Sequence, residues 1–409
     1  MRYSKLFGKT TRTAKTYDSV NATLLQKAGF IDMVMAGVYT YLPLGLKVLT
    51  NIENIIREEM NTVASEVLMP ALAPKSAWEV TNRLDSVDIL MKTAPANEKA
   101  KQKNDTEYIL NPTHEEVVTP LVQKYTFSYK DLPQAVYQIQ TKFRNEPRVK
   151  SGLMRGREFR MKDLYSFHRS LDDFKQFYEE MKKVYTRTFD RLGIGEDTVI
   201  ALASGGDFTK DYSHEFQTVC DTGEDTLCLD EETNIYYNKE VAPEGKKYKT
   251  MRAAEVGNIF PLHTKFTNAL HFNYFDENGK EQPVFMGCYG IGSSRVMGLI
   301  VEKMHDEKGM IWPKEVAPAR AFLITIGRDE SVIKTGNNLY DTLTKKGIDV
   351  LFDDRPEAAP GAKFADADLI GCPYRLVISP KTGDKIELKK RTEKETKLVT
   401  QEELLNLLV

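Results

Sequence analysis

Apolar residues recur every three to four positions in three segments of the chain. These segments span 44–63, 114–125 and 171–192, and charged residues fill the positions between the apolar ones. Such spacing gathers the apolar side chains on one face, so each segment is predicted to be an amphipathic helix. Residues 92–106 are instead polar and rich in lysine, which predicts a mobile surface loop.

Two predicted strands flank a basic loop in the middle of the chain. Ala135–Arg144 and Glu158–His168 are the strands, and Glu146–Gly156 is the loop. A strand–loop–strand unit aims the side chains nearest the loop into one cleft. The cleft is therefore a candidate binding site.

The side chains nearest this loop suit a nucleoside triphosphate. The guanidinium groups of Arg144 and Arg155 match phosphate oxygens. The ring of Phe159 can stack on a base, and Glu146 adds a carboxylate between the two arginines in the sequence. The alternative is an ordinary hairpin with a solvated basic loop.

A second glycine-rich segment follows about 140 residues later. Val284–Met286 is a predicted short strand, Gly287–Ser294 a glycine-rich turn and Val296–Lys303 a helix. The spacing G-x-x-G-x-G differs from the dinucleotide-binding fingerprint. Arg295 falls in the first turn of the helix, where the helix dipole disfavours a cation. This position indicates an anionic ligand, although a surface ion pair would also explain it.

The last ninety residues alternate strands and helices after a short linker at Ala317–Ala319. That alternation predicts a small α/β domain with a largely parallel core. The predicted elements, in chain order, are the strand Ala321–Ile326, the helix Val332–Lys345, the strand Asp349–Phe352, the helix Lys363–Ile370 and the strand Arg375–Ile378.

The bulk composition narrows the classes further. A length of 409 residues fits two or three domains. The net charge is −2, so a nucleic-acid partner would need local basic patches such as 142–160 or 381–391. The four cysteines lack C-x-x-C spacing, which argues against zinc and against a disulfide framework and favours a reducing compartment. No apolar run approaches about 18 residues, so no membrane span is expected.

The N-terminal residues bear on location. Residues 2–15 are basic and contain no hydrophobic stretch, so they do not form a secretory signal. They slightly resemble a transit peptide. We expect a cytoplasmic protein, with an organellar matrix as the alternative.

Three segments in order resemble the motifs of the class II aminoacyl-tRNA synthetases. The predicted helix at 44–63 and the stretch Glu66–Leu72, which contains Pro70, resemble motif 1. The basic hairpin resembles motif 2, and the glycine-rich segment with Arg295 resembles motif 3.

Strings between the motifs resemble the bacterial-type prolyl-tRNA synthetases, and the resemblance covers nearly the whole chain. Threonyl and seryl relatives share motifs 2 and 3 only loosely, so the subtype rests on these strings. They are Gly37–Gly45, Asn111–Glu116, Tyr137–Arg144, Met161–His168, Ser213–Gln217, Glu255–Asn258 and Phe364–Gly371.

The resemblance implies an α+β fold. A catalytic domain with an antiparallel sheet and flanking helices would be followed by a C-terminal α/β anticodon-binding domain. The expected divisions are 1–225 (catalytic domain with motifs 1 and 2), 226–250 (short connection), 251–313 (completion with motif 3) and 319–409 (anticodon-binding domain).

The resemblance also implies the activity. L-proline would be activated with ATP and Mg²⁺ to prolyl-adenylate and transferred to the 3′ end of the proline tRNA by a homodimer, without zinc. Relatives often carry an editing domain between the strings at 213–217 and 255–258. Here only 37 residues, Thr218–Ala254, lie between them, too few for an independent domain.

Two other functions are alternatives to this one. A synthetase-like paralogue that binds or regulates without catalysis typically loses the motif arginines or the tail domain, and this chain keeps Arg144, Arg155, Arg295 and a tail. An editing or deacylating factor is disfavoured by the missing editing domain.

By resemblance, several residues would bind ATP. Arg144 would hold the α-phosphate and the proline carboxylate, and Arg155 would reach the γ-phosphate. Phe159 would stack on one face of adenine, and Arg295 would cover the other face and the γ-phosphate. Glu146 would meet the adenine edge or the tRNA end.

Further positions carry less certain roles. Glu215 and Glu255 are alternative candidates for holding Mg²⁺. Thr264 matches a position near the ATP ribose, but His263 stands where relatives have glycine.

The proline pocket is expected to pair a carboxylate with the imino nitrogen. Thr113 and Glu115 match the family positions for this contact, and the wall of the ring pocket comprises Met161, Tyr165 and Phe216. From the residues alone, Thr113 and Glu116 also fit a capping box at a helix start, and both interpretations can hold together. His114 is expected to be structural.

Anticodon contacts are expected from Asp354, Arg355 and Lys363. The loop at 353–361 departs from relatives because it lacks their second arginine and has one more residue.

Overall fold

The computed structural model describes residues 1–11 and 16–408, and the chain divides into two compact units. One unit comprises Ala36–Val38 and Glu53–Val296, and the other comprises Met1–Met35, Tyr39–Ile52 and Met297–Val409. Residues 12–15 of the basic N-terminal stretch, and Val409, lie outside the description. The boundaries expected at 225, 250 and 313 remain a prediction.

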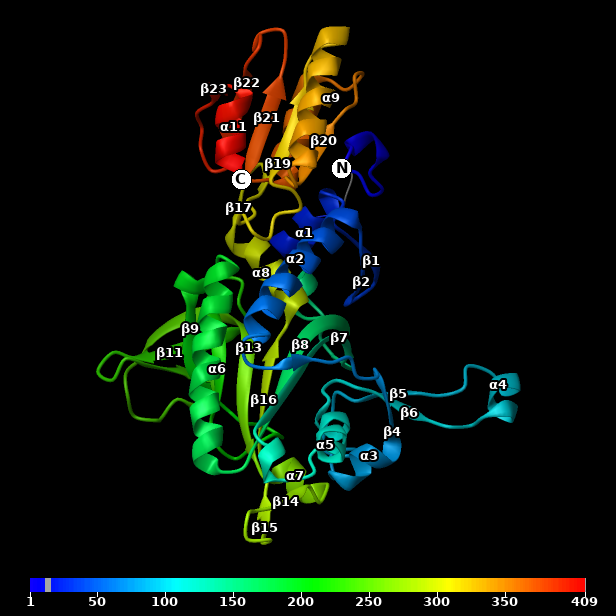
Figure 1. Cartoon of the computed structure of the whole chain (residues 1–409), viewed down its shortest axis with the longest axis vertical. Helices are drawn as coiled ribbons and strands as arrows, with labels where there is room; N and C mark the ends of the chain where they lie inside the picture. Colours follow the sequence, from blue (N-terminus) through cyan, green and yellow to red (C-terminus); the bar gives the residue numbers. More distant parts are fainter. Residues whose placement is uncertain (12–15, 409) are drawn as a thin grey trace. The chain divides into compact units, whose positions relative to one another are not determined.

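A nine-stranded sheet forms the centre of the first unit (Figure 1). Its pairs are antiparallel except for β3 with β7 and β9 with β12. This confirms the α+β class. In spatial order the strands are β10 Ser213–Val219, β9 Thr198–Ala203, β12 Ile235–Asn238, β11 Asp225–Asp230, β13 Lys249–His263, β16 Phe285–Ile291, β8 Glu158–His168, β7 Gln134–Phe143 and β3 Ser65–Glu66.

The basic hairpin forms as predicted. β7 and β8 pair antiparallel from Gln134 opposite Phe167 to Phe143 opposite Glu158. Within the connecting loop, Gly152–Met154 forms a short 3₁₀ helix. The hairpin therefore delivers Arg144 and Phe159 to the same end of the sheet.

The glycine-rich turn predicted at 287–294 is wrong. Gly287 and Gly290 lie inside β16, which pairs with both β13 and β8, and the helix α8 begins at Ser293 and ends at Lys303. A Cβ on Gly287 would collide with the Phe174 and Tyr289 rings. Gly287 thus makes room for neighbouring side chains within a strand instead of making a turn.

The three predicted amphipathic helices are present as α2 Pro43–Met60, α5 Glu115–Lys124 and α6 Leu171–Arg191. Helix α6 packs against β8, β13 and β16, as Figure 1 shows. At its N-terminus, the Ser170 side chain accepts a hydrogen bond from the Asp173 amide at 3.2 Å.

A small three-stranded sheet carries the segment predicted as a mobile loop. Its strands are β4 Leu72–Pro74, β6 Tyr108–Leu110 and β5 Met91–Thr93, and α3 Lys75–Val80 follows β4. The 92–106 segment is not wholly irregular: it contains the exposed helix α4, Glu98–Lys103, whose N-cap Asn97 accepts from the Ala100 amide. Asparagine capping of a lysine-rich turn was not foreseen.

Shorter elements complete the chain. They are α1 Val20–Lys27, β1 Ile31–Met35, β2 Val38–Tyr41, α7 Lys265–Ala269, β14 Asn273–Phe275, β15 Glu281–Pro283, β17 His305–Asp306, β18 Gly309–Met310 and the 3₁₀ helices Tyr3–Lys5, Tyr129–Asp131, Gly195–Asp197 and Lys239–Val241.

The C-terminal part of the second unit is an α/β domain built on a five-stranded sheet. The strands β20, β19 and β21 are parallel, which confirms the predicted core, and β22 and β23 add antiparallel. The elements are β19 Ala321–Thr325, α9 Glu330–Lys345, β20 Val350–Asp353, α10 Pro360–Ile370, β21 Tyr374–Ile378, β22 Ile386–Lys390, β23 Lys397–Val399 and α11 Gln401–Leu408.

The first residues of the chain pack on this domain. The Phe352 amide of β20 donates to the Met1 carbonyl at 2.9 Å, and Arg2 forms an isolated parallel β-bridge with Phe352. Tyr3 is fully buried. Among residues 1–11 and 16–408, no helix is both long and apolar enough to cross a bilayer.

Candidate active site

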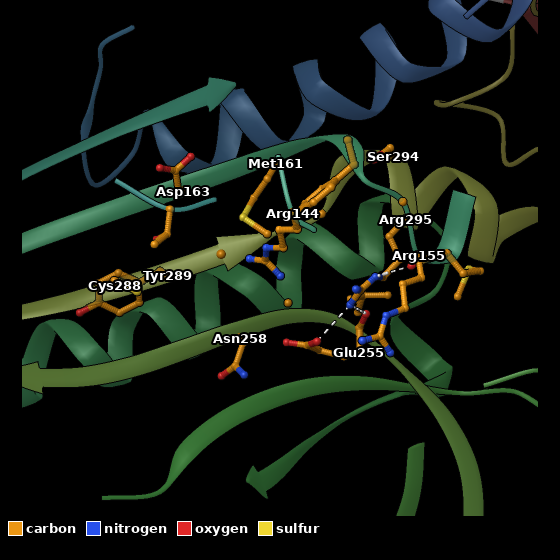
Figure 2. A pocket seen from close by; sticks show the side chains of 18 of the residues that line it. Arg144, Arg155, Met161, Asp163, Glu255, Asn258, Cys288, Tyr289, Ser294 and Arg295 are labelled. Atoms are coloured by element: carbon orange, nitrogen blue, oxygen red, sulfur yellow. Dashed lines mark hydrogen bonds and ion pairs between the residues drawn. The ribbon is translucent and has the colours of Figure 1, made fainter. Parts of the chain in front are cut away.

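Three adjoining cavities of about 170, 200 and 300 Å³ open at one end of the nine-stranded sheet. Arg144 and Glu255 line all three. Figure 2 shows Arg144, Arg155 and Arg295 approaching the same space, with Glu255 among them. The structure therefore brings together residues from motif 2, from motif 3 and from β13.

Arg144 directly follows β7, and its backbone amide donates to the Arg157 carbonyl at 2.9 Å. Its guanidinium lies 5.2 Å from the centroid of the Phe159 ring. The buried Nε makes no hydrogen bond to the described residues. Burial, followed by the nearby Arg295, lowers the pKa of Arg144. An unpartnered guanidinium beside a second arginine is suited to an anionic ligand.

Arg295 occupies the first turn of α8 and is held by acceptors. Its Nε donates to the Met154 carbonyl at 2.9 Å, and its Nη1 donates to a Glu255 carboxylate oxygen at 3.0 Å. Part of the alternative explanation for Arg295, an ion pair at the helix start, is therefore correct. The pair lies in the cavity wall, so it leaves Arg295 beside the space for a ligand.

Arg155 lines two cavities and contacts two carboxylates. Its Nε donates to Glu146 Oε2 at 2.8 Å, and its Nη1 donates to Glu224 Oε2 at 3.2 Å. Glu224, in the turn between β10 and β11, and Asp225, the first residue of β11, also line the second cavity. Neither residue was expected at the site, because 218–254 was predicted only to be a short connection. The acidic pair directly after Gly223 was the available signal.

Glu215 and Glu255 lie on paired strands and line the 300 Å³ cavity. Burial, together with the charge of Glu255, raises the pKa of Glu215 to about 8. The Glu215 carboxylate accepts from Gln217, Asn238 and Asn258 at 2.8, 3.1 and 3.3 Å. A divalent cation beside these carboxylates would offset the burial and the repulsion from Glu255 that together raise the pKa of Glu215. The donor set therefore fits Mg²⁺ shared with substrate oxygens.

Within the described part of the chain, no group of three or more His, Cys, Asp or Glu side chains is placed to hold a metal ion.

A buried polar network forms the floor of the smallest cavity. Lys142 Nζ lies 2.7 Å from Asp163 Oδ1, and the Tyr165 hydroxyl donates to Asp163 Oδ2 at 2.8 Å. The His114 amide donates to Tyr165 at 2.9 Å. Burial, followed by the charge of Lys142, lowers the pKa of His114 to about 4, so the ring is neutral at pH 7. Met161 and Tyr165 line the cavity as expected, whereas Lys142 and Asp163 were not foreseen.

The capping box proposed at the start of α5 is wrong. His114 is the N-cap, without a side-chain cap hydrogen bond. The Thr113 hydroxyl donates to Glu115 Oε2 at 2.6 Å. Glu116 pairs with Arg83 at 2.8 Å, and Arg83 also lies 3.3 Å from Glu115. Both glutamates turn toward a buried cation that the local sequence does not reveal.

Three expected site residues, Glu115, Phe216 and Thr264, do not line these cavities, and Glu115 is fully buried. Phe216 packs against Tyr185 and Phe189, with ring centroids 4.9 and 5.5 Å away. Because neighbours on a strand face opposite ways, Glu215 faces the cavity and Phe216 faces the core. Thr264 is instead the N-cap of α7, and its hydroxyl accepts from Asn268 at 3.1 Å.

His263 adopts a φ of 51°, a region that favours glycine. Its Nε2 lies 2.7 Å from Asp211 Oδ2. The glycine of relatives and this histidine thus suit the same backbone conformation. Histidine is among the non-glycine residues enriched there.

The three anticodon candidates are engaged within the second unit. Lys363 is buried, and its Nζ donates to the Thr325 carbonyl at 2.9 Å, so it is not a surface contact. Arg355 pairs with Asp353 and Asp366 at 2.6 and 2.7 Å. Asp354 accepts from the amide and the hydroxyl of Ser4 at 2.9 and 2.8 Å.

Comparison with known proteins identifies the class. Residues 98–304 match the family model described as "tRNA synthetase class II core domain (G, H, P, S and T)", and residues 320–409 match "Anticodon binding domain". A Giardia lamblia prolyl-tRNA synthetase, solved in complex with prolyl-adenylate, has the same fold, with a TM-score of 0.79 at 19% identity. The match covers 95% of this chain and 78% of that one. The fold and the motif residues are those of a class II aminoacyl-tRNA synthetase.

Curated relatives identify the amino-acid specificity within this class. Proline–tRNA ligases of Ehrlichia ruminantium, Rhodopseudomonas palustris and Rickettsia rickettsii are 38, 36 and 39% identical to the chain. The matches cover 99, 96 and 90% of this chain and the same shares of those proteins. The chain belongs to the proline–tRNA ligase family.

Proposed function

We infer that the chain joins L-proline to the proline tRNA in two steps, through prolyl-adenylate, at the expense of ATP. Family membership over nearly the whole chain supports this activity. The observation on which the site assignment depends is the half-buried Arg144 at the junction of three cavities, with an unpartnered Nε. Anion binding at that point is what adenylate formation requires.

In the first step the proline carboxylate attacks the α-phosphorus of ATP, and pyrophosphate leaves. Arg144 would bind both the carboxylate and the α-phosphate, which aligns the reactants and stabilises the charge on the phosphoryl oxygens. Arg155 and Arg295 would bind the outer phosphates. Phe159 and Glu146 would contact adenine. No side chain needs to exchange a proton in this step, which agrees with a site rich in arginine.

Mg²⁺ would arrive with ATP. Glu255, and Glu215 once it is deprotonated, are the residues that would hold it. When bound, the ion neutralises part of the phosphate charge.

The proline site is proposed beside Thr113. Glu115 supplies the carboxylate for the imino cation, and Thr113 orients it through their 2.6 Å hydrogen bond. Met161 and Tyr165 line the neighbouring cavity and would contact the ring.

Partners and location are proposed on narrower grounds. The motif 1 segment exposes Leu46, Leu68 and Leu72, which supports a homodimer with twofold symmetry. Active monomers in sedimentation at micromolar concentration would contradict it. The C-terminal domain would bind the anticodon. Cys228, Cys288 and Cys372 are buried thiols that form no disulfide among the described residues, which suits the cytoplasm.

Proline-dependent exchange of pyrophosphate into ATP tests the first step. The purified chain should support exchange with L-proline, weakly with alanine, and not with threonine, serine, glycine or histidine. Absence of proline-dependent exchange by a folded preparation would overturn the proposal.

A further inference from the structure

A buried cluster of two carboxylates and one guanidinium lies behind the proposed proline site. It consists of Glu115, Glu116 and Arg83, whose exposed fractions are 0, 2 and 3%. Arg83 Nη1 lies 2.8 Å from Glu116 Oε1 and 3.3 Å from Glu115 Oε2. If both glutamates are ionised, the cluster holds one more negative charge than positive charge.

Aromatic rings fix the guanidinium in place. The Arg83 Cζ lies 5.2, 4.8 and 5.1 Å from the ring centroids of Trp78, Phe208 and Phe266. Arg83 also lines the 300 Å³ cavity together with Thr113 and Arg144. The charge of Arg83 can therefore influence a ligand in the cavity while its side chain stays packed between the three rings.

The two glutamates are not equally satisfied. Glu116 Oε1 receives the short Arg83 contact and a hydrogen bond from the Thr81 hydroxyl at 2.9 Å. Glu115 has the longer Arg83 contact and the Thr113 hydroxyl, and Glu115 Oε1 and Glu116 Oε2 are both buried with no hydrogen-bond partner in the described structure. The shorter Arg83 contact compensates the charge of Glu116, so the uncompensated charge belongs to Glu115, whose carboxylate is hydrogen-bonded to the cavity-lining Thr113.

We propose that Arg83 is a positioning residue that neutralises Glu116 and so reserves the negative charge of Glu115 for the imino cation of proline. This inference rests on the proposed role of Glu115. It makes the charge count of the cluster, rather than Glu115 alone, the determinant of proline affinity.

Removing Arg83 should make the cluster too negative, whereas removing the charge of Glu116 should make it neutral. Without Arg83, two neighbouring buried carboxylates would share one proton, because like charges at this distance cannot both ionise readily. Burial and the charge of Glu115 already raise the pKa of Glu116 even with Arg83 present. Without the charge of Glu116, Arg83 would pair fully with Glu115 and cancel the charge that proline needs.

Other charged groups around Glu115 bear on any pH dependence. Lys265, whose Nζ donates to the Asp207 carbonyl, has its pKa lowered by burial and then by Arg83. Lys142 pairs with Asp163. The remaining groups that sense the charge of Glu115 are Arg144, Tyr165 and Cys288.

A double-mutant cycle in the exchange assay tests the proposal. Arg83→Gln and Glu116→Gln should each raise the KM for proline about tenfold, which is the free energy of a shift of one pKa unit. The KM for ATP should stay within about twofold of the parent value. The double variant R83Q/E116Q keeps one buried carboxylate and should regain most of the proline affinity. In Arg83→Gln the KM for proline should fall as pH rises from 6 to 9, because the shared proton must leave before the cation binds.

Alternative results separate the possibilities. If the double variant binds proline no better than either single variant, Arg83 serves only packing, and the inference is wrong. If Arg83→Gln does not fold, Glu116→Gln still decides, since an unchanged KM for proline there refutes the charge count. If Glu115→Gln itself leaves the KM for proline unchanged, the proposed proline site fails, and the inference fails with it.

Discussion

Arg144 is the residue on which the proposed chemistry depends most. Lysine at this position would keep the charge but lose the planar fork that can hold two oxygens at once. Arg144→Lys is expected to slow proline-dependent pyrophosphate exchange roughly 10²-fold or more, about 3 kcal/mol of transition-state stabilisation. Arg148→Lys, an exposed change in the same loop, is the matched control. Equal activity of the two variants would remove Arg144 from the site.

Glu215 gives the site a dependence on pH. Its pKa is raised from 4.5 to about 8, so the folded protein binds this proton more tightly than the unfolded chain does. Stability is therefore lost as pH rises from about 4.5 to about 8, by at most about 1.4 kcal/mol per pH unit.

Glu215→Gln removes this titration. Thermal unfolding should show the variant gaining stability relative to the parent chain between pH 6 and pH 8. Glu277→Gln, an exposed change between β14 and β15, should not do so. A constant difference between Glu215→Gln and the parent across this range would contradict the account.

At the residue scale, the sequence located the motif arginines, and the structure places Arg144, Arg155 and Arg295 around common cavities. It failed for Phe216, because the face that a strand residue presents depends on pairing register. It also missed Arg83, whose partners Glu115 and Glu116 lie more than thirty positions away. Such partners are invisible to local spacing.

At the scale of elements, periodic helices and the basic hairpin were predictable because their signals are local. The glycine-rich run was misjudged, since glycine serves both turns and crowded strands. In the C-terminal domain, the turn after β20 is tied by Asp354 to Ser4, a contact between residues 350 positions apart in the sequence. No pattern near Asp354 could have indicated it.

That tie predicts a selective effect on tRNA. Asp354→Ala removes two hydrogen bonds to a carboxylate and should loosen the turn, raising the KM for proline tRNA up to about tenfold. Pyrophosphate exchange, which needs no tRNA, should be unchanged. Asp341→Ala on the exposed side of α9 serves as the control. An unchanged KM for tRNA would exclude this turn from anticodon recognition.

At the scale of the whole molecule, the connection at 218–254 is informative. Strands β11 and β12 join the nine-stranded sheet between β9 and β13, so the connection extends the catalytic sheet. The sequence predicted only a short connection there, because the pairing of these strands with the catalytic sheet is set by long-range contacts. A relative of matched length, covered over 99%, likewise has no room for a large insertion.

Without an inserted editing domain, the chain is predicted to leave mischarged alanyl-tRNA uncorrected. Alanine is smaller than proline, so the pocket cannot exclude it sterically, and the lost groups discriminate by about 1–3 kcal/mol each. The chain should form some alanyl-tRNA of the proline isoacceptor and should not hydrolyse it. Pre-charged alanyl-tRNA incubated with the pure protein should decay at the rate seen in buffer alone. Faster decay would reveal a hydrolytic site that the account does not contain.

The central claim is that this chain charges proline tRNA at the site around Arg144. The most direct measurement is the transfer of labelled proline to purified proline tRNA by the parent chain and by Arg144→Lys, with ATP and Mg²⁺ present. The account predicts ATP-dependent charging of proline tRNA but not of threonine tRNA, with a rate reduced roughly 10²-fold in the variant. No charging by the folded parent chain, or full charging by the variant, would contradict it.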